Sequence, residues 1–266
     1  MEQNELIDKI TKEIMSRLND NSKTQNSIKQ QGSDSQSPQK LWMSPEELAK
    51  YIDHTLLKPE AVQHQFEQLC NEALKYRFKS VCVNSGWVSF VAKKLRGSGI
   101  LICSVIGFPL GEMDSRSKAF EARSAIDNGA NELDMVINVG ALKSRNLKLV
   151  EEDIRAIRRA CRGNTILKVI IETVLLTEEE KILACEISKK AEADFVKTST
   201  GFSGGGATVN DIVLMRRTVG QNMGVKASGL IRDYDTAIAL IQAGANRIGC
   251  GASVAIITGA VAKGNY

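Results

Sequence analysis

Residues 194–230, DFVKTSTGFSGGGATVNDIVLMRRTVGQNMGVKASGL, contain a complete strand–helix–strand unit. The short β-branched runs at 194–200 and 224–230 predict strands, and the stretch 208–219 between them has an amphipathic helical pattern. Two strands that are joined through a helix usually lie parallel in one sheet. The unit therefore predicts an α/β fold.

The same alternation extends in both directions from this unit, beginning at Ser44. Eight such units in about 220 residues fit a closed (β/α)₈ TIM barrel. An open doubly wound sheet usually has fewer strands and a G-x-G-x-x-G loop after the first strand, and no such loop follows here. The expected strands are YIDHTLL (51–57), SVCVN (80–84), LICSVIGF (101–108), ELDMVINV (132–139), LKVIIET (167–173), DFVKTST (194–200), GVKASGL (224–230) and NRIGCG (246–251). Amphipathic helical stretches are expected at 115–129, 147–162, 177–193, 208–219 and 233–244.

Composition and charge fit a soluble globular protein. The chain has 266 residues, of which 43% are hydrophobic and 25% charged, so one barrel has enough apolar material for its core. The net charge of +4 is not clustered, which disfavours nucleic acid as a partner. No apolar run of about 18 residues and no signal peptide occurs, so we expect neither a membrane-spanning nor a secreted protein. The cysteines form no C-x-x-C pair and are interpreted as reduced, buried thiols of a cytoplasmic protein: Cys70, Cys82, Cys103, Cys161, Cys185 and Cys250.

Four charged residues stand inside strands that should be almost entirely apolar: Asp134, Lys168, Lys197 and Lys226. A single buried lysine with a single aspartate would be explained by a structural ion pair. Three lysines cannot be neutralised by one carboxylate, and burying excess charge costs several kcal/mol per ion. We therefore favour a functional site, at the end of the barrel where the carboxyl ends of the strands meet.

The chemistry that such a lysine cluster suits is imine formation. A lysine at its usual pKa of about 10.4 is protonated and cannot attack a carbonyl, but desolvation and a neighbouring cation lower that pKa. Lys197 and Lys226 lie on consecutive predicted strands, about 4.8 Å apart in a sheet, so one can act on the other. A metal site is not expected, because His64 lies in a polar helical stretch and His54 is explained by a structural hydrogen bond.

Glycine-rich segments follow the last three predicted strands, at 200–206, 228–232 and 249–253. Each alone could be a flexible loop. In barrels, however, the loops after the seventh and eighth strands often bind phosphate through backbone amides. Their clustering favours a phosphate site.

The chain closely resembles the class I deoxyribose-phosphate aldolases from about Tyr51 to Ile257. The motifs that carry the resemblance are YIDHTLLKPEA, SVCVN, SVIGFPLG, NGANELDMVINVGALKS, LKVIIET, ADFVKTSTGFSGGGAT and VKASG. The resemblance implies reversible cleavage of 2-deoxy-D-ribose 5-phosphate to D-glyceraldehyde 3-phosphate and acetaldehyde. It also implies a lysine Schiff base, no metal or other cofactor, and a homodimer.

Carried over by motif, the resemblance makes Lys197 the nucleophile, Lys226 the residue that perturbs it, and Asp134 a partner of Lys226 in proton transfer. Family members often end in a mobile tyrosine that assists proton transfer, and Tyr266 matches it, although a frayed tail would end the same way. Residues expected to line the site or bind substrate are Asp53, Thr55, Lys168, Thr198, Gly201, Gly229, Gly249 and Gly251.

Two departures from the family pattern keep an alternative open. Gly229-Leu230 stands where the family usually has Gly-Gly, and Gly251-Ala252 stands where it usually has two serines. The loss of the serine hydroxyls keeps open a lysine-imine aldolase that acts on another sugar phosphate. A second alternative, a non-catalytic barrel scaffold, is disfavoured because the buried charged residues are all present.

The N-terminal segment lies outside the aldolase pattern. Residues 1–18 predict an amphipathic helix, 19–43 have the composition of a flexible linker, and 44–266 are the expected barrel domain. A short helix on such a linker resembles the encapsulation peptides that recruit enzymes to bacterial microcompartments. An oligomer contact or a membrane-surface helix is the alternative, and the near-balanced charges disfavour the membrane. The expected partner is thus a shell protein, and the expected location is the cytoplasm, within a microcompartment.

Overall fold

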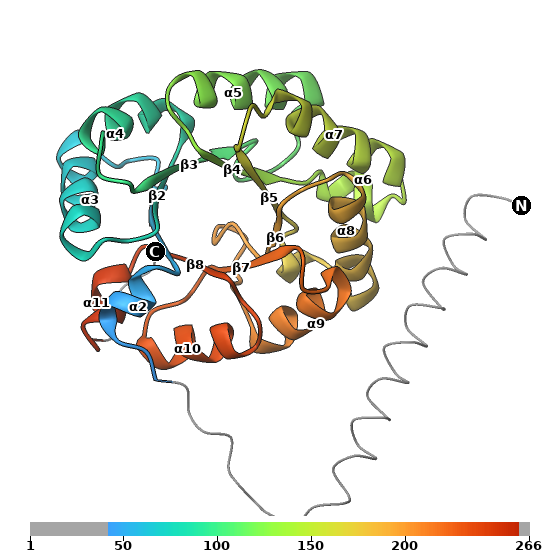
Figure 1. The fold of residues 1–266 in the computed structure, drawn as a ribbon. Coiled ribbons are helices and arrows are strands. Elements are labelled where there is room, and N and C mark those ends of the chain that lie inside the picture. Colours follow the sequence, from blue (N-terminus) through green and yellow to red (C-terminus); the bar gives the residue numbers. More distant parts are fainter. Residues whose placement is uncertain (1–41, 261–266) are drawn as a thin grey trace, which may run out of the picture. The chain divides into compact units, whose positions relative to one another are not determined.

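The strands form a closed, all-parallel barrel in the computed structural model, which describes residues 42–260 (Figure 1). Each strand pairs with the next along the chain, and the last pairs with the first. The strands are β1 (Ile52–Leu56), β2 (Ser80–Val83), β3 (Leu101–Ile106), β4 (Glu132–Val136), β5 (Ile166–Ile170), β6 (Phe195–Lys197), β7 (Gly224–Ser228) and β8 (Arg247–Cys250). The predicted TIM barrel is confirmed, and every one of these strands overlaps a predicted range.

Helices surround the barrel on its outside (Figure 1). The α-helices are α2 (Pro45–Ala49), α3 (Gln63–Tyr76), α4 (Val88–Lys94), α5 (Ser115–Asp127), α6 (Val139–Lys143), α7 (Leu147–Ala160), α8 (Glu178–Lys190), α9 (Val209–Val219), α10 (Tyr234–Gln242) and α11 (Ser253–Ile257). Two short 3₁₀ turns, η1 (Ser85–Trp87) and η2 (Thr173–Leu175), follow β2 and β5.

Local sequence explains where these helices begin. Thr177 caps α8 in a capping box with Glu180, and Asp114 caps α5 by accepting from the backbone N–H groups of Arg116 and Ser117. These caps satisfy amide groups that have no partner within the helix. The five helices for which ranges were predicted start within a residue of the predicted positions: α5, α7, α8, α9 and α10.

Packing of apolar strand and helix residues holds the barrel together. Val81, Leu133, Val169 and Val196 are fully buried in their strands. On α7, Ile154 and its neighbours along one face are buried as well, as the predicted amphipathic pattern requires. Each such side chain contributes about 1.5–3 kcal/mol through burial.

The strand β6 ends earlier than its predicted range, at Lys197 rather than at residue 200. The hydroxyl of Thr198 donates to the carbonyl of Ser228, and the hydroxyl of Thr200 donates to Glu172. The backbone of Thr198 still donates to the carbonyl of Lys226 at 3.1 Å, and beyond this residue side-chain hydrogen bonds replace the strand pairing.

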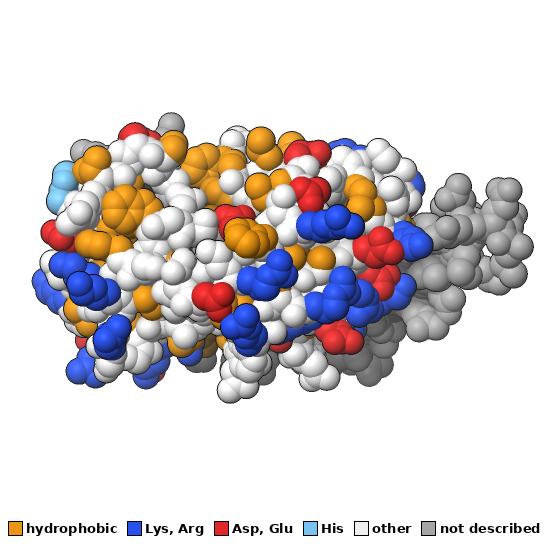
Figure 2. All heavy atoms as spheres, turned by 90° about the horizontal axis from the view of Figure 1, so that it is seen from above, with side chains coloured by type: hydrophobic (Ala, Val, Ile, Leu, Met, Phe, Trp, Pro, Cys, Tyr) orange, Lys and Arg blue, Asp and Glu red, His pale blue; other side chains and the backbone are white. Residues whose placement is uncertain are grey.

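The predicted helix at residues 1–18, the linker as far as residue 41, and Tyr266 all lie outside the described residues. Where the described residues begin, the backbone of Met43 donates to and accepts from the hydroxyl of Tyr234, at 2.8 and 3.0 Å. Among residues 42–260, no helix is both long enough and apolar enough to cross a membrane. Hydrophobic, basic and acidic side chains are interspersed on the face shown in Figure 2.

Candidate active site

Charged side chains from six strands meet inside the barrel. Ionised groups in a protein interior cost several kcal/mol each unless they are paired, so their contacts decide what the set can do. We call the following residues, all of them buried, the buried charge network: Asp53 (β1), Glu132 and Asp134 (β4), Lys168 (β5), Lys197 (β6), Lys226 (β7) and Arg247 (β8).

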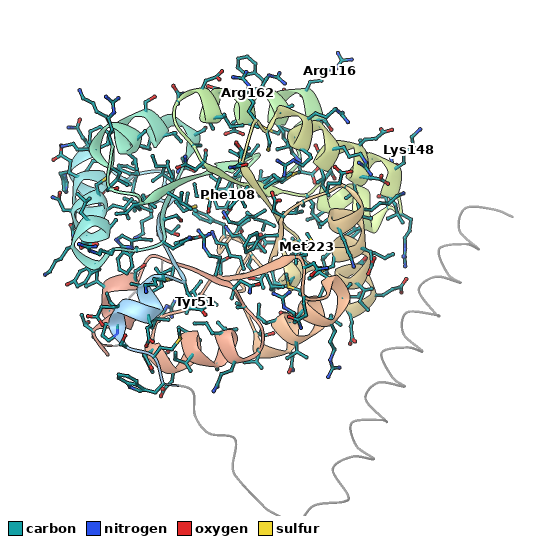
Figure 3. The ribbon with its side chains drawn as sticks, in the orientation of Figure 1. Tyr51, Phe108, Arg116, Lys148, Arg162 and Met223 are labelled. Carbon is teal, nitrogen blue, oxygen red and sulfur yellow. The ribbon has the colours of Figure 1, made fainter. Side chains whose placement is uncertain are left out.

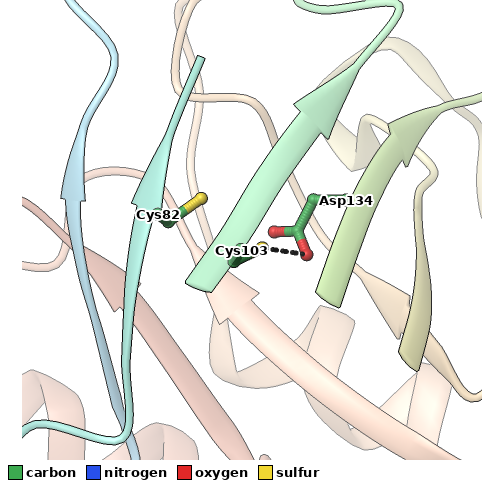
Figure 4. A group of neighbouring side chains, drawn as sticks. All are labelled: Cys82, Cys103 and Asp134. Carbon is green, nitrogen blue, oxygen red and sulfur yellow. Dashed lines mark hydrogen bonds between the residues drawn. The ribbon is translucent and has the colours of Figure 1, made fainter. Parts of the chain in front are cut away.

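Asp134 is the centre of this network. Its Oδ2 accepts from Nζ of Lys197 at 2.8 Å and from Nζ of Lys226 at 2.7 Å. Its Oδ1 accepts from Nζ of Lys168 at 2.9 Å and from the thiol of Cys103 at 3.1 Å (Figure 4). Burial alone would raise the pKa of Asp134, but the three ammonium groups hold that pKa well below its usual range. Asp134 is therefore a carboxylate.

Lys197 and Lys226 lie side by side, because the register of β6 with β7 pairs their Cα positions. Nζ of Lys226 also forms an ion pair with Oδ2 of Asp53 at 2.5 Å. Burial alone would lower the pKa of Lys226, but the carboxylates of Asp134 and Asp53 raise it well above the usual value. The raised pKa favours the cationic form of Lys226, which shares one carboxylate oxygen with Lys197.

Lys197 is the last residue of β6 and is 3% exposed. Its position is the carboxyl end of a barrel strand, where substrates of TIM-barrel enzymes bind. Small exposure and a place at the open end are both needed for an amine that must meet a substrate and yet be shielded from water.

The other members of the buried charge network form ion pairs with one another deeper inside the barrel. Lys168 forms an ion pair with Glu132 at 2.5 Å, and Arg247 pairs with both Glu132 and Asp53. The hydroxyl of Ser80 donates to Asp53 at 2.7 Å. Lys168 and Asp53 are fully buried, so they support the network rather than reach into the open end of the barrel.

Charge counting within the network singles out Lys197. Three carboxylates, from Asp53, Glu132 and Asp134, face four basic side chains. Lys168, Lys226 and Arg247 suffice to balance the carboxylates, and the network is neutral overall when the amine of Lys197 carries no charge. An uncharged amine is the form that attacks a carbonyl.

Glu132 and Arg247 are not among the residues that the sequence predicted for the site. Both lie in predicted strands. A charged residue in a strand that should be buried is the signal that identified Asp134, and it applies equally to these two. Glu132 also stands two residues before Asp134, and residues at this spacing face the same side of a strand. Spacing and polarity together could have found it.

Cys82, Cys103 and Asp134 bring two thiols and a carboxylate within 4.8 Å of one another (Figure 4). Such a set could in principle ligate a metal. Asp134, however, already accepts from three lysine side chains, and their positive charge repels a cation. The group is better suited to holding Asp134 than to binding a metal.

The two histidines are placed as the sequence suggested. His54 is buried, with Nδ1 at 2.9 Å from the hydroxyl of Ser253 and Nε2 at 2.8 Å from Glu72. Both ring nitrogens are thus engaged within the protein, which indicates a structural role. His64 is exposed on α3.

The hydroxyls of two predicted site residues, Thr55 and Thr198, tie backbone segments together at the open end. The hydroxyl of Thr55 donates to the carbonyl of Asp53 at 2.8 Å. Thr198 joins the end of β6 to β7 through Ser228, accepting from its N–H at 3.0 Å and donating to its carbonyl at 2.9 Å. Both hydroxyls thereby fix the ends of strands that carry network residues.

The predicted glycines allow close packing at the open end. A Cβ at Gly249 would lie 2.9 Å from Cε of Lys226, so a side chain there would displace the lysine. A Cβ at Gly206 would lie 2.3 Å from the carbonyl oxygen of Gly229, so these two loops touch through their backbones. Gly201 and Gly251 lie in the loops after β6 and β8. The three glycine-rich loops thus surround the same end of the barrel as Lys197.

Comparison with known proteins identifies relatives over most of the chain. Residues 47–260 match the DeoC/LacD family of aldolases. A deoxyribose-phosphate aldolase of Streptococcus gordonii is 61% identical over 219 residues, which is 82% of this chain and 99% of the relative. The enzyme of the same name from Brevibacillus brevis is 60% identical over 81% of this chain and 97% of the relative. A tetrameric deoxyribose phosphate aldolase from Aeropyrum pernix superposes with a TM-score of 0.76 at 34% identity, over 81% of this chain and 91% of that structure.

Proposed function

This chain belongs to the DeoC/LacD family of aldolases, and from that premise we propose that Lys197 forms the Schiff base through which it cleaves 2-deoxy-D-ribose 5-phosphate. The products are D-glyceraldehyde 3-phosphate and acetaldehyde. The observation that carries the assignment is the sharing of one Asp134 oxygen by Lys197 and the cationic Lys226, in a network that is neutral when Lys197 is uncharged.

The roles of the residues follow from this arrangement. The Lys197 amine adds to the C1 aldehyde, and loss of water gives an imine that draws electrons from the C2–C3 bond. Removal of the proton from the C3 hydroxyl breaks that bond, releases D-glyceraldehyde 3-phosphate and leaves an enamine on Lys197. Protonation of the enamine at C2 and addition of water to the resulting imine release acetaldehyde and restore the amine. Asp134, an ionised carboxylate beside the imine, accepts and returns protons, and Lys226 keeps positive charge beside it.

Reductive trapping tests this proposal. We expect acetaldehyde and borohydride to add one ethyl group to the protein and peptide mapping to place it on Lys197. The matched control is the Lys197→Met variant, which should remain unmodified at that peptide. An ethyl group found only on other lysines, at equal extent in both proteins, would refute the role of Lys197.

We propose further that the glycine-rich loops after β6, β7 and β8 bind the substrate phosphate. Their support is the clustering of Gly201, Gly229, Gly249 and Gly251 at the end of the barrel that holds Lys197. The test compares kcat/KM for deoxyribose 5-phosphate with that for deoxyribose. A clear preference for the phosphorylated sugar is expected, and equal values would favour a different substrate.

For the N-terminal segment, we propose that residues 1–18 act as an encapsulation peptide for a microcompartment shell protein in the cytoplasm. Two observations support it: the amphipathic pattern, and a family match that begins only at residue 47 although the Streptococcus gordonii relative is covered over 99% of its length. Deletion of residues 1–20 should release the enzyme from shell fractions with unchanged specific activity. Unchanged co-purification with shells would contradict the proposal.

We also propose that the chain assembles as a homodimer, as the family resemblance implies. The relative from Aeropyrum pernix is described as a tetramer, so the two states must be separated by experiment. Sedimentation velocity should give twice the 29.0 kDa chain mass, and a monomer or tetramer would contradict the dimer.

A further inference from the structure

Two aromatic side chains from loops after non-adjacent strands meet at the open end of the barrel. Phe108 follows β3 and Phe202 follows β6, and their ring centroids are 5.2 Å apart with the planes at 87°. This edge-to-face geometry is a favourable arrangement for aromatic pairs. Phe108 lies within the ring of strands in Figure 3. The pair therefore spans part of the open end of the barrel.

Phe108 connects this pair to the reacting lysine. It packs against the apolar cluster that includes Cys82 and Cys103. The thiol of Cys103 donates to Oδ1 of Asp134, and Oδ2 of the same carboxylate accepts from Lys197. Phe108 thus packs against the cluster whose member Cys103 holds the Asp134 carboxylate beside Lys197.

Phe202 stands on a loop that is held firmly in place. Glu172, 2% exposed and in the left-handed region at φ 59°, accepts from the N–H of Thr200 at 3.1 Å and from its hydroxyl at 2.5 Å. The hydroxyl of Ser203 donates to the same carboxylate at 3.0 Å, and the N–H of Phe202 donates to the hydroxyl of Thr200 at 3.0 Å. A fixed loop therefore sets the position of the ring.

Despite this fixed position, Phe202 is 43% exposed, so its ring keeps an accessible apolar surface beside Phe108. If position 202 had only to be solvated, a polar side chain would suit it as well as phenylalanine does. An apolar surface beside a buried amine is suited to the hydrocarbon part of a bound carbonyl compound.

We propose that the Phe108–Phe202 pair sets the size of the aldehyde that Lys197 accepts as donor, favouring the two-carbon unit over longer ones. The inference rests on the proposed function. A two-carbon enamine has no alkyl group beyond C2, whereas the enamine of propanal carries a methyl group there. The paired rings, held at the open end of the barrel, would occupy the space that this methyl group needs.

The test measures aldol addition to D-glyceraldehyde 3-phosphate with acetaldehyde and with propanal as donors. Phe202→Ala should raise the ratio of kcat/KM for propanal to that for acetaldehyde about tenfold, since one methylene is worth about 10–200-fold in a tight pocket. Phe108→Leu should shift the ratio in the same direction. The matched control is Phe120→Ala, because Phe120 is 69% exposed on α5, outside the barrel.

The inference is overturned if Phe202→Ala leaves the ratio at the parent's value, including the case in which both donors slow equally because the loop has loosened. Phe202→Leu, a milder change, gives the same test should the alanine variant unfold. Borohydride trapping on the parent enzyme reports on the proposed function separately. If Lys197 is trapped in the parent enzyme and the ratio of kcat/KM values for the two donors is unchanged in Phe202→Ala, only the proposed role of the Phe108–Phe202 pair is rejected.

Discussion

Lys197 differs from the other three basic residues of the buried charge network in the number of carboxylates that it contacts. Lys168, Lys226 and Arg247 each contact two of the three carboxylates, whereas Lys197 contacts only the Asp134 oxygen that Lys226 also uses. The positive charge of Lys197 is therefore the one that the network can lose without leaving a carboxylate unbalanced. The same residue is the one at the open end of the barrel.

This difference predicts unequal effects on stability for two otherwise matched substitutions. Lys226→Met removes a cation from Asp53 and Asp134 and should lower the free energy of unfolding by roughly 3–5 kcal/mol. Lys197→Met should lower it by less than about 1 kcal/mol, because balanced charges remain. Urea unfolding measures both, with Lys189→Met on the exposed surface of α8 as control. Equal losses for the two variants would refute the charge count.

Asp134 makes stability depend on pH in a defined direction. Its pKa in the fold is well below the usual value, which is about 3.9 in an unfolded chain. A lowered carboxyl pKa contributes stability that is present above the unfolded pKa and is lost as pH falls below it. We expect the free energy of unfolding to decline below about pH 4, with a shallower decline in Asp134→Asn.

The control for this pH series is Asp127→Asn, whose carboxylate pairs with Arg162 on the surface and contributes little. Its decline should match that of the parent. A decline in Asp134→Asn as steep as the parent's would show that other carboxylates account for the acid sensitivity.

At the scale of single elements, strands were predicted better than the loops that follow them. Alternating apolar and β-branched runs placed the strands, because burial in a barrel demands such residues. The early end of β6 depends on side chains distant in sequence, such as Glu172, which holds Thr200. A local sequence pattern does not specify contacts with residues that are distant in the chain, so the loop geometry could not be predicted.

Leu230, in the loop after β7, gives a test at this scale. It is 50% exposed and has φ 59°, a left-handed conformation that costs a residue with a Cβ about 1–2 kcal/mol. Leu230→Gly should therefore raise the free energy of unfolding by about 1 kcal/mol. In the control Leu110→Gly, at an exposed loop residue without a positive φ, urea unfolding should show a loss. A lower free energy of unfolding in both variants would contradict the claim that the backbone at Leu230 is strained.

At the scale of the whole molecule, the sequence predicted both the barrel and the strands that carry the lysines. Closure of the barrel follows from the number of strand–helix units, and closure is what brings Lys197 and Asp134 together from β6 and β4. The pairing of Glu132 with Arg247 and Lys168 was not predicted, because it depends on which inward side chains reach across the closed barrel. Counting every polar residue in the predicted strands would have found these residues but not their partners.

The most direct measurement of the central claim is the turnover of deoxyribose 5-phosphate by Lys197→Met, compared with Lys189→Met. With the fold preserved in both variants, loss of the amine should lower kcat by at least roughly a thousandfold, while Lys189→Met keeps the parent's rate. Turnover by a folded Lys197→Met variant at the parent's rate would contradict the account.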